Sequence, residues 1–150
     1  MKVLFAASEN AWGGFLNRIG PELPQCEFRA TGGFYVDDLS GVDVLIPTMT
    51  QITEETLASG DRLRLIQQCG AGLEGVDLEA ARRRNIAVAN VPTDISGNAD
   101  SVAELGIYMM IGLSRHAMDM AGSLRNRKMG EPQGLALGGK TAAVIGLGGI

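Results

Sequence analysis

The chain ends in a glycine-rich segment that follows an apolar run at 141–145. The segment consists of Gly146, Leu147, Gly148, Gly149 and Ile150, which are five of the six positions of the pattern G-x-G-x-x-G. In that pattern the first glycine makes a tight turn, the second lets the backbone approach a pyrophosphate, and the third lets a helix pack on the preceding strand. Residues 146–150 are therefore candidate cofactor-binding residues after a predicted strand at 141–145, although such a turn is often only a turn.

A second phosphate-type pattern lies just upstream, at 134–141. The sequence GLALGGKT matches the P-loop pattern G-x-x-x-x-G-K-[ST]. A working P-loop follows a strand and opens a helix, so that successive N–H groups and the helix dipole face the phosphates. Here a polar loop precedes the pattern and a predicted strand follows it. Because this order is reversed, we disfavour a P-loop nucleotide hydrolase.

A third candidate is the glycine-rich segment at 68–77, which lies at the carboxyl end of the apolar run at 63–69. Open α/β sheets bind ligands beyond the carboxyl ends of their strands. Glycines at such a place let main-chain N–H groups close on an anion such as a carboxylate. Taken by itself, the segment favours a plain strand-to-helix turn.

Other reactive side chains have plainer structural explanations. Glu104 follows Ser101 at the spacing of a capping box, which predicts a helix N-terminus there. The single histidine, His116, falls late in the predicted helix, which favours a surface or interface role over a general base. Two cysteines, Cys26 and Cys69, and one histidine are too few for a Cys/His zinc site, so we expect no metal site. The two cysteines could form a disulfide, but a reducing cytosol favours two buried free thiols.

The strands and helices that must position these segments can be predicted from the alternating pattern of the first 90 residues. Short apolar runs at 2–7, 26–31, 42–47, 63–69 and 86–90 alternate with helix-like segments. Thr53 and Asp77 are expected N-caps of two of these helices. Strands that alternate with helices imply right-handed crossovers and a parallel sheet. We therefore predict a five-stranded, doubly wound, flavodoxin-like α/β domain.

A long helix is predicted to follow this domain. The residues at 91–97 have the composition of a loop, and the apolar pattern from Ser101 continues to about Arg125. Apolar residues nearly surround the start of this helix, so we expect protein on both sides of it. A loop at 126–138 and the strand at 141–145 follow. The expected domains are 1–97, and 98–150 as a linking helix with the start of a Rossmann domain.

Composition narrows the classes of partner. The chain has 150 residues, 45% hydrophobic and 20% charged, with a net charge of −4. A negative surface repels phosphate backbones, so we do not expect nucleic acid as a partner. The apolar stretch at 102–113 is too short to span a bilayer, and the N-terminal apolar run is shorter than the core of a signal peptide. We expect a soluble, cytoplasmic protein without a membrane partner.

Three blocks of the sequence occur together in the order found in a known family. The blocks are Gly-Ala-Gly at 70–72 with Val-Asp-Leu at 76–78, then Asn-Ala-Asp-Ser-Val-Ala-Glu at 98–104, then Gly-Lys-Thr at 139–141 leading to 146–150. Together they resemble the D-isomer-specific 2-hydroxyacid dehydrogenases, which include phosphoglycerate dehydrogenase and hydroxypyruvate reductase. The first 60 residues match only in their βα rhythm and at 51–57. Leu105 stands where many members have a histidine.

The resemblance implies roles for particular residues. Main-chain N–H groups of Ala71 and Gly72 would hold the carboxylate of a small 2-keto or 2-hydroxy acid. Asn98 and Val102 would line the nicotinamide side of the cleft. The pyrophosphate of NAD or NADP would be bound through the last segment, at Leu147, Gly149 and Ile150.

The resemblance also implies that this chain is the front part of a longer enzyme. Family members use an arginine, a glutamate and a histidine downstream of the fingerprint, so we expect no catalytic residue in these 150 positions. The chain alone is then expected to be inactive and to bind no cofactor. The resemblance implies a homodimer formed through the long helix. The alternative from another class is a non-enzymatic, dimerising α/β module.

Overall fold

The computed structural model describes residues 1–149 and divides the chain into two compact units. The first unit is Met1–Pro92, and the second begins at Thr93. Each unit is described here by itself. The division falls a few residues before the expected boundary at 97, because a short helix that was expected to be loop belongs to the second unit.

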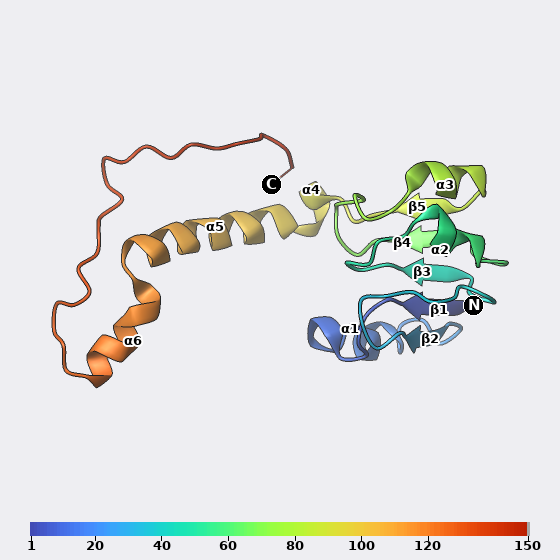
Figure 1. The fold of residues 1–150 in the computed structure, drawn as a ribbon, viewed down its shortest axis with the longest axis horizontal. Coiled ribbons are helices and arrows are strands. Elements are labelled where there is room, and N and C mark those ends of the chain that lie inside the picture. Colours follow the sequence, from blue (N-terminus) through green and yellow to red (C-terminus); the bar gives the residue numbers. More distant parts are fainter. Residues whose placement is uncertain (150) are drawn as a thin grey trace. The chain divides into compact units, whose positions relative to one another are not determined.

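The first unit contains a parallel five-stranded sheet (Figure 1). The five strands are β1 (Lys2–Phe5), β2 (Glu27–Ala30), β3 (Val44–Ile46), β4 (Leu65–Gln67) and β5 (Ala87–Ala89). Their order in the sheet is β2-β1-β3-β4-β5, and every pair is parallel. This is the flavodoxin-like order, so the predicted fold class is confirmed, with each strand shorter than its apolar run.

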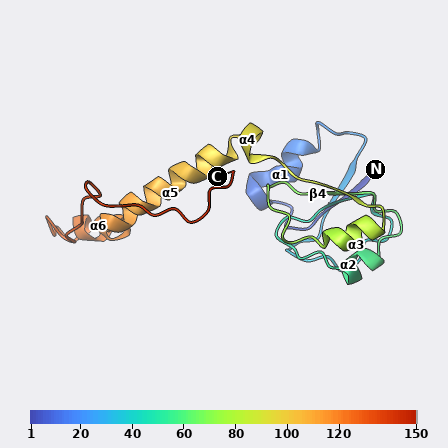
Figure 2. The ribbon, with the colours of Figure 1, turned by 90° about the horizontal axis from the view of Figure 1, so that it is seen from above.

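Helices cover both faces of this sheet (Figure 2). Helix α1 (Ala11–Ile19) lies on one face, and α2 (Glu54–Ala58) and α3 (Leu78–Arg83) lie on the other. The predicted N-caps are confirmed, since Thr53 Oγ1 accepts from the N–H of Thr56 at 3.3 Å and Asp77 Oδ1 from that of Ala80 at 2.9 Å. Two short helices on one face and one on the other make the sheet doubly wound.

The core consists of two apolar clusters that share β1. Side chains alternate along a strand, so Val3, Phe5 and Ala7 pack with the residues of α1, whereas Leu4 and Ala6 pack with those of α2 and α3. Phe5 and Ala6 are fully buried. This packing fixes where β1 ends, and therefore where the residues that follow it emerge at the edge of the sheet.

In the second unit the predicted start of the long helix is wrong. The helix α5 (Asn98–Ser114) begins three residues before Ser101, with Gly97 as N-cap at φ 68°. Ser101 Oγ donates to the carbonyl of Gly97 at 3.2 Å instead of capping, so Ser101 and Glu104 form no capping box. A glycine at a positive φ lets the chain enter the helix earlier than the apolar pattern indicated. One turn of helix, α4 (Thr93–Ser96), stands just before it.

The predicted length of that helix is also wrong. It ends at Ser114, and α6 (Ala117–Arg125) follows a break at His116, whose φ is 54°. The carbonyl of Ser114 accepts from the N–H of Leu135 at 2.7 Å, so a later loop satisfies a carbonyl that the continued helix would have used. No residue of α5 is buried among the residues that the structure describes, and the expected cover on both sides is not found there.

The predicted strand at 141–145 is wrong as well. Across the described residues, 141–149 contain neither a strand nor a helix, and Val144 and Ile145 are exposed. An extended segment becomes a strand only when a neighbouring strand takes up its N–H and C=O groups, and no such neighbour lies within 1–149. Among these residues no helix has the length and apolar character needed to cross a bilayer.

Candidate functional site

The carboxyl ends of the central strands bring several polar groups to one edge of the sheet. Thr48 follows β3, Gln68 follows β4, and Asn90 follows β5. Parallel sheets bind their ligands at this edge because the loops after neighbouring strands meet there. The predicted substrate residues Ala71 and Gly72 lie in the loop after β4, so the structure places them at this edge.

A hydrogen-bonded network joins the loops after β1, β3 and β4. Thr48 Oγ1 donates to the carbonyl of Ala6 at 2.5 Å, and the Gln68 amide donates from Nε2 to the carbonyl of Thr48 at 2.9 Å. The Oε1 atom of Gln68 accepts from the N–H of Cys69 at 2.9 Å. Thr48 is buried and has a φ of 57°, which is uncommon for a β-branched residue. The network therefore holds a strained turn and leaves both side chains with partners inside the protein.

The glycine-rich turn after β4 is fixed by its carbonyl groups. Asn90 Nδ2 donates to the carbonyl of Ala71 at 2.7 Å, and the N–H of Val91 donates to that of Gly70 at 3.0 Å. Within residues 1–149 the N–H groups of Ala71 and Gly72 donate to no protein acceptor. Two neighbouring amides without partners, in a turn whose carbonyls are held, form an arrangement that can accept an anion.

The far side of this turn is tied to the loop before α2. The N–H of Ile52 donates to the carbonyl of Gly75 at 2.7 Å, and the N–H of Asp77 donates to the carbonyl of Ile52 at 2.9 Å. A side chain at Gly72 would meet the carboxylate of Glu74. The turn is thus held at both ends, and Glu74 is the acidic group that lies against it.

A cavity of about 460 Å³ opens beside the turn. Its lining combines the two loops after β3 and β4 with one face of α1. Burial raises the pKa of the Cys69 thiol, so this thiol stays neutral at ordinary pH. The lining residues are Trp12, Phe15, Arg18, Thr48, Met49, Gln68, Cys69, Gly70 and Gly72.

The candidate segment at 68–77 contained Gln68, Cys69, Gly70 and Gly72, and sequence reasoning missed the rest of this lining. Thr48 could have been found, because it stands directly after the predicted strand at 42–47, where ligand-binding loops begin. Trp12 and Phe15 gave no such signal. Phe15 lies on α1, and Trp12 lies at the kink near its start, where residues 12–14 have positive φ. Only packing against Phe5 brings the two rings to the edge.

The predicted cofactor residues lie in the second unit. Asn98 is the first residue of α5, and Val102 lies on the next turn of the same helix; both are exposed. The glycine-rich segment 146–149 has no regular secondary structure. The remaining predicted residue, Ile150, lies outside the described residues.

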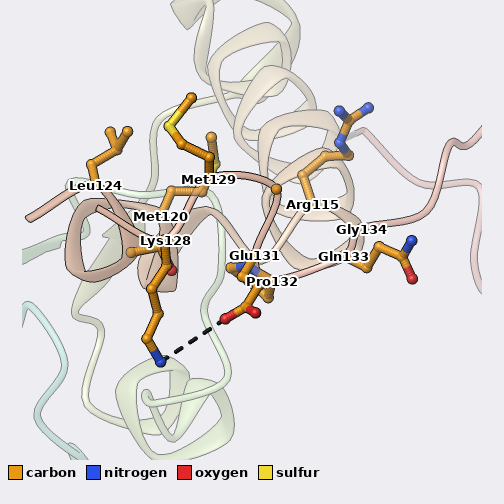
Figure 3. A pocket seen from close by; sticks show the side chains of 11 residues that line it. Arg115, Met120, Leu124, Lys128, Met129, Glu131, Pro132, Gln133 and Gly134 are labelled. Atoms are coloured by element: carbon orange, nitrogen blue, oxygen red, sulfur yellow. Dashed lines mark ion pairs between the residues drawn. The ribbon is translucent and has the colours of Figure 1, made fainter. Parts of the chain in front are cut away.

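A second cavity, of about 350 Å³, lies where the loop after α6 returns to the end of α5 (Figure 3). Met120 and Leu124 contribute from α6 and Arg115 from the C-cap of α5. Lys128 Nζ lies 3.9 Å from Glu131 Oε2. The P-loop-like segment contributes only its first residue, Gly134. None of the predicted site residues lines this cavity.

The sequence matches a family model described as D-isomer specific 2-hydroxyacid dehydrogenase, catalytic domain, over residues 22–137. D-3-phosphoglycerate dehydrogenase of Synechocystis sp. is 34% identical over 109 residues, which is 71% of this chain and 19% of that protein. Hydroxypyruvate reductase of Thermotoga maritima is 35% identical over 112 residues, which is 73% of this chain and 36% of that protein. The chain thus spans only a fifth to about a third of the length of these relatives.

Solved structures agree on the fold. The apo-structure of D-lactate dehydrogenase from Escherichia coli has a TM-score of 0.74 at 22% identity, over 99% of this chain and 49% of that chain. NAD-dependent formate dehydrogenase from Staphylococcus aureus, in complex with NAD, has a TM-score of 0.64 at 24% identity, over 85% of this chain and 41% of that chain. The sequence match, together with this shared fold, shows that the chain belongs to the D-isomer-specific 2-hydroxyacid dehydrogenase family.

Proposed function

We propose that this chain is the N-terminal part of an oxidoreductase that interconverts a 2-keto acid and a D-2-hydroxy acid with NAD or NADP. Residues 1–97 would form the substrate-binding domain, and 98–150 the linking helix and the start of the cofactor domain. The relatives support this reading by their names, and the short span of each that is matched supports the view of a partial enzyme. The full protein would act in the cytoplasm.

One observation carries the substrate side of the proposal. The amides of Ala71 and Gly72 point from a turn whose carbonyls are held by Asn90 and Val91, and both amides lack acceptors among the described residues. A substrate carboxylate would accept hydrogen bonds from both amides, and the Glu74 carboxylate beside Gly72 would have to turn away from it. Because the clamp is made of main chain, it selects a carboxylate and leaves the rest of the substrate to other residues.

The cofactor side of the proposal rests on sequence position. Asn98 and Val102 would line the nicotinamide side of the cleft, and the pyrophosphate would lie against Gly146, Leu147, Gly148, Gly149 and Ile150. The helix N-terminus that such a site needs is not among residues 1–149, so this chain alone is expected to bind neither NADH nor NADPH. Without a bound cofactor and a proton donor, it is expected to be inactive.

A homodimer is the proposed assembly, with α5 as the main contact. Its apolar side chains are exposed along the whole helix. Contiguous exposed apolar surface of this kind marks an interaction site. The same observation favours the second candidate, a non-enzymatic module that dimerises through this helix, and activity separates the two candidates.

The test compares the 150-residue chain with a chain extended through the downstream cofactor domain. We expect NADH oxidation with 2-keto acids from the extended chain only. An extended chain that dimerises but turns over no 2-keto acid would favour the non-enzymatic module. Turnover by the 150-residue chain would show that its own residues suffice for the reaction.

Isothermal titration of the 150-residue chain completes this test. We expect no heat from NADH, and none from ATP, because the P-loop-like segment neither follows a strand nor opens a helix. Tight ATP binding that Lys140→Ala abolishes would reverse our rejection of a P-loop.

A further inference from the structure

The cavity beside the glycine-rich turn has one apolar wall, formed by Trp12, Phe15 and Met49. The Trp12 ring lies edge-on to Phe5, with centroids 5.5 Å apart, and edge-on to Phe15 at 5.9 Å. Phe5 and Phe15 stack at 5.4 Å, and Phe5 is fully buried. The sheet thus supports the indole from behind, while Trp12 and Met49 keep 42% and 68% of their surfaces exposed. The wall is apolar, supported and open to a ligand.

The polar side chains of the same cavity are already engaged. The Thr48 hydroxyl donates to the carbonyl of Ala6, and both ends of the Gln68 amide have protein partners. The Cys69 thiol stays neutral, since burial raises its pKa. A ligand that displaced these bonds would leave buried polar groups without partners, which is unfavourable. The cavity therefore favours apolar contact over new hydrogen bonds on this side.

Arg18 is the one charged residue that lines the cavity among the described residues. Its Nη2 atom donates to the carbonyl of Trp12 at 3.1 Å, and the φ of Trp12 is 53°. The guanidinium thus helps to hold the turn that presents the indole. A phosphate or second carboxylate on a substrate is bound by several converging donors, and a single exposed arginine with an internal partner does not provide them.

The other end of this cavity is the glycine-rich turn itself, since Gly70 and Gly72 also line it. Its volume of about 460 Å³ leaves room for a side chain beside the carboxylate. We propose that the substrate is a 2-keto or 2-hydroxy acid with a large, uncharged, apolar side chain, aromatic or branched. Its carboxylate would lie on the amides of Ala71 and Gly72 and its side chain against Trp12, Phe15 and Met49. This inference rests on the proposed function, whose carboxylate position it uses.

The test follows two reporters in one spectrum of the ¹⁵N-labelled chain. The amides of Ala71 and Gly72 report the carboxylate, and the indole N–H of Trp12, the only tryptophan, reports the side chain of the ligand. The probes are D-phenyllactate, D-lactate and D-3-phosphoglycerate, which share a carboxylate and a 2-hydroxyl. We expect all three to shift the two amides, and D-phenyllactate alone to shift the indole and to bind about tenfold more tightly than D-lactate.

The two reporters keep the two proposals apart. Shifts at Ala71 and Gly72 with every acid, but none at Trp12, would overturn the apolar subsite and leave the proposed function standing. A response to D-phenyllactate at Trp12 alone would support the subsite and count against the proposed carboxylate position. If no acid shifts either the two amides or the Trp12 indole, both the apolar subsite and the proposed carboxylate position are overturned. Tightest binding of D-3-phosphoglycerate, lost in Arg18→Gln, would overturn the subsite in favour of an anionic side chain.

Variants make the assignment specific. Met49→Ala should weaken D-phenyllactate about fivefold and leave D-lactate unchanged, because only the larger side chain reaches the wall. Met49 is exposed, so its replacement should not unfold the domain, and Met129→Ala in the second unit is a matched control. Trp12→Phe, followed through the amides of Ala71 and Gly72, should retain more affinity than Trp12→Ala. Equal effects of Met49→Ala on D-phenyllactate and D-lactate would contradict the proposal.

Discussion

The Asn90 side chain donates from Nδ2 to the carbonyl oxygen of Ala71 at 2.7 Å, across two neighbouring loops. Asn90 follows β5 and Ala71 follows β4, so this bond fixes the turn that carries the two free amides. The carbonyl of Ala71 belongs to the same peptide as the N–H of Gly72. Its orientation therefore sets the direction in which that N–H points.

Replacement of Asn90 tests this relationship. Asn90→Ala should cost about 1 kcal/mol or less in the free energy of unfolding, as for a neutral bond at the surface. It should, however, increase hydrogen exchange at Gly70–Gly72 and weaken carboxylate binding. Asn90→Asp should weaken binding more, because a carboxylate repels both the Ala71 carbonyl and the incoming substrate. Asn17→Ala, at an exposed site on α1, is the control, and equal exchange in all these variants would refute the role of the bond.

Thr48→Val should destabilise the first unit. The variant keeps the shape of the side chain but removes the donor to the carbonyl of Ala6, which is fully buried. A buried carbonyl left without its partner costs about 1–3 kcal/mol. Urea denaturation followed by circular dichroism measures this loss. Thr141→Val, at an exposed site in the second unit, should be neutral, and a neutral Thr48→Val would mean that another group satisfies Ala6.

Asp43 should make stability fall in acid. The N–H of Lys2 donates to its Oδ2 at 2.8 Å, and Arg62 Nη2 lies 3.1 Å from its Oδ1. The backbone bond from Lys2, assisted by the charge of Arg62, lowers the pKa of Asp43 below its ordinary value, although desolvation opposes the shift. The folded pKa is depressed, so the carboxylate stabilises the fold fully above the unfolded pKa of about 3.9. That contribution disappears as the pH falls through the lower, folded pKa.

Thermal denaturation between about pH 7 and about pH 3 checks this pH dependence. Asp43→Asn should be less stable than the parent chain at neutral pH, and the difference should shrink in acid. Asp37→Asn, which removes an exposed carboxylate, should leave the curve unchanged. A constant difference between Asp43→Asn and the parent at every pH would contradict the assigned role.

Association should depend on α5. Ile107 and Ile111 lie one turn apart on this helix and are 54% and 48% exposed. Ile107→Glu with Ile111→Glu should dissociate a homodimer, because each charge would have to be buried without a partner in the interface. Sedimentation velocity at several concentrations measures the state. Phe34→Glu, at an exposed apolar residue of the first unit, should not alter it, and a monomeric parent chain would exclude the interface.

The first unit could be predicted from the sequence because its signals are local. Each strand is an apolar run, and Thr53 and Asp77 have the residue types that cap helices. The strand order could also be predicted, since short βα units leave few right-handed arrangements. The local pattern also predicted a glycine-rich turn after the fourth strand, but only the family resemblance singled out Ala71 and Gly72 within it.

The structure of the second unit differs from the sequence prediction because it depends on contacts between residues far apart in the chain. The apolar pattern continues from Ser101 to Leu124, yet the helix breaks at His116. Just before this break, the N–H of Leu135 donates to the carbonyl of Ser114. The apolar run at 141–145 is a good strand by composition and has no neighbour among the described residues. The apolar wall of the cavity was missed because Trp12 and Phe15 belong to no recognisable sequence motif. Only packing against Phe5 places them beside the turn.

The strand order has a consequence for how the protein is made. All five strands lie within the first 89 residues, and both the innermost and the outermost strands pair with partners inside that span. During synthesis the chain emerges from its N-terminus, and domains generally fold as units in that order. The sheet can therefore form during synthesis without any contact from the second unit. The glycine-rich turn likewise needs only Asn90 and Val91 to hold its carbonyls, and both belong to the first unit.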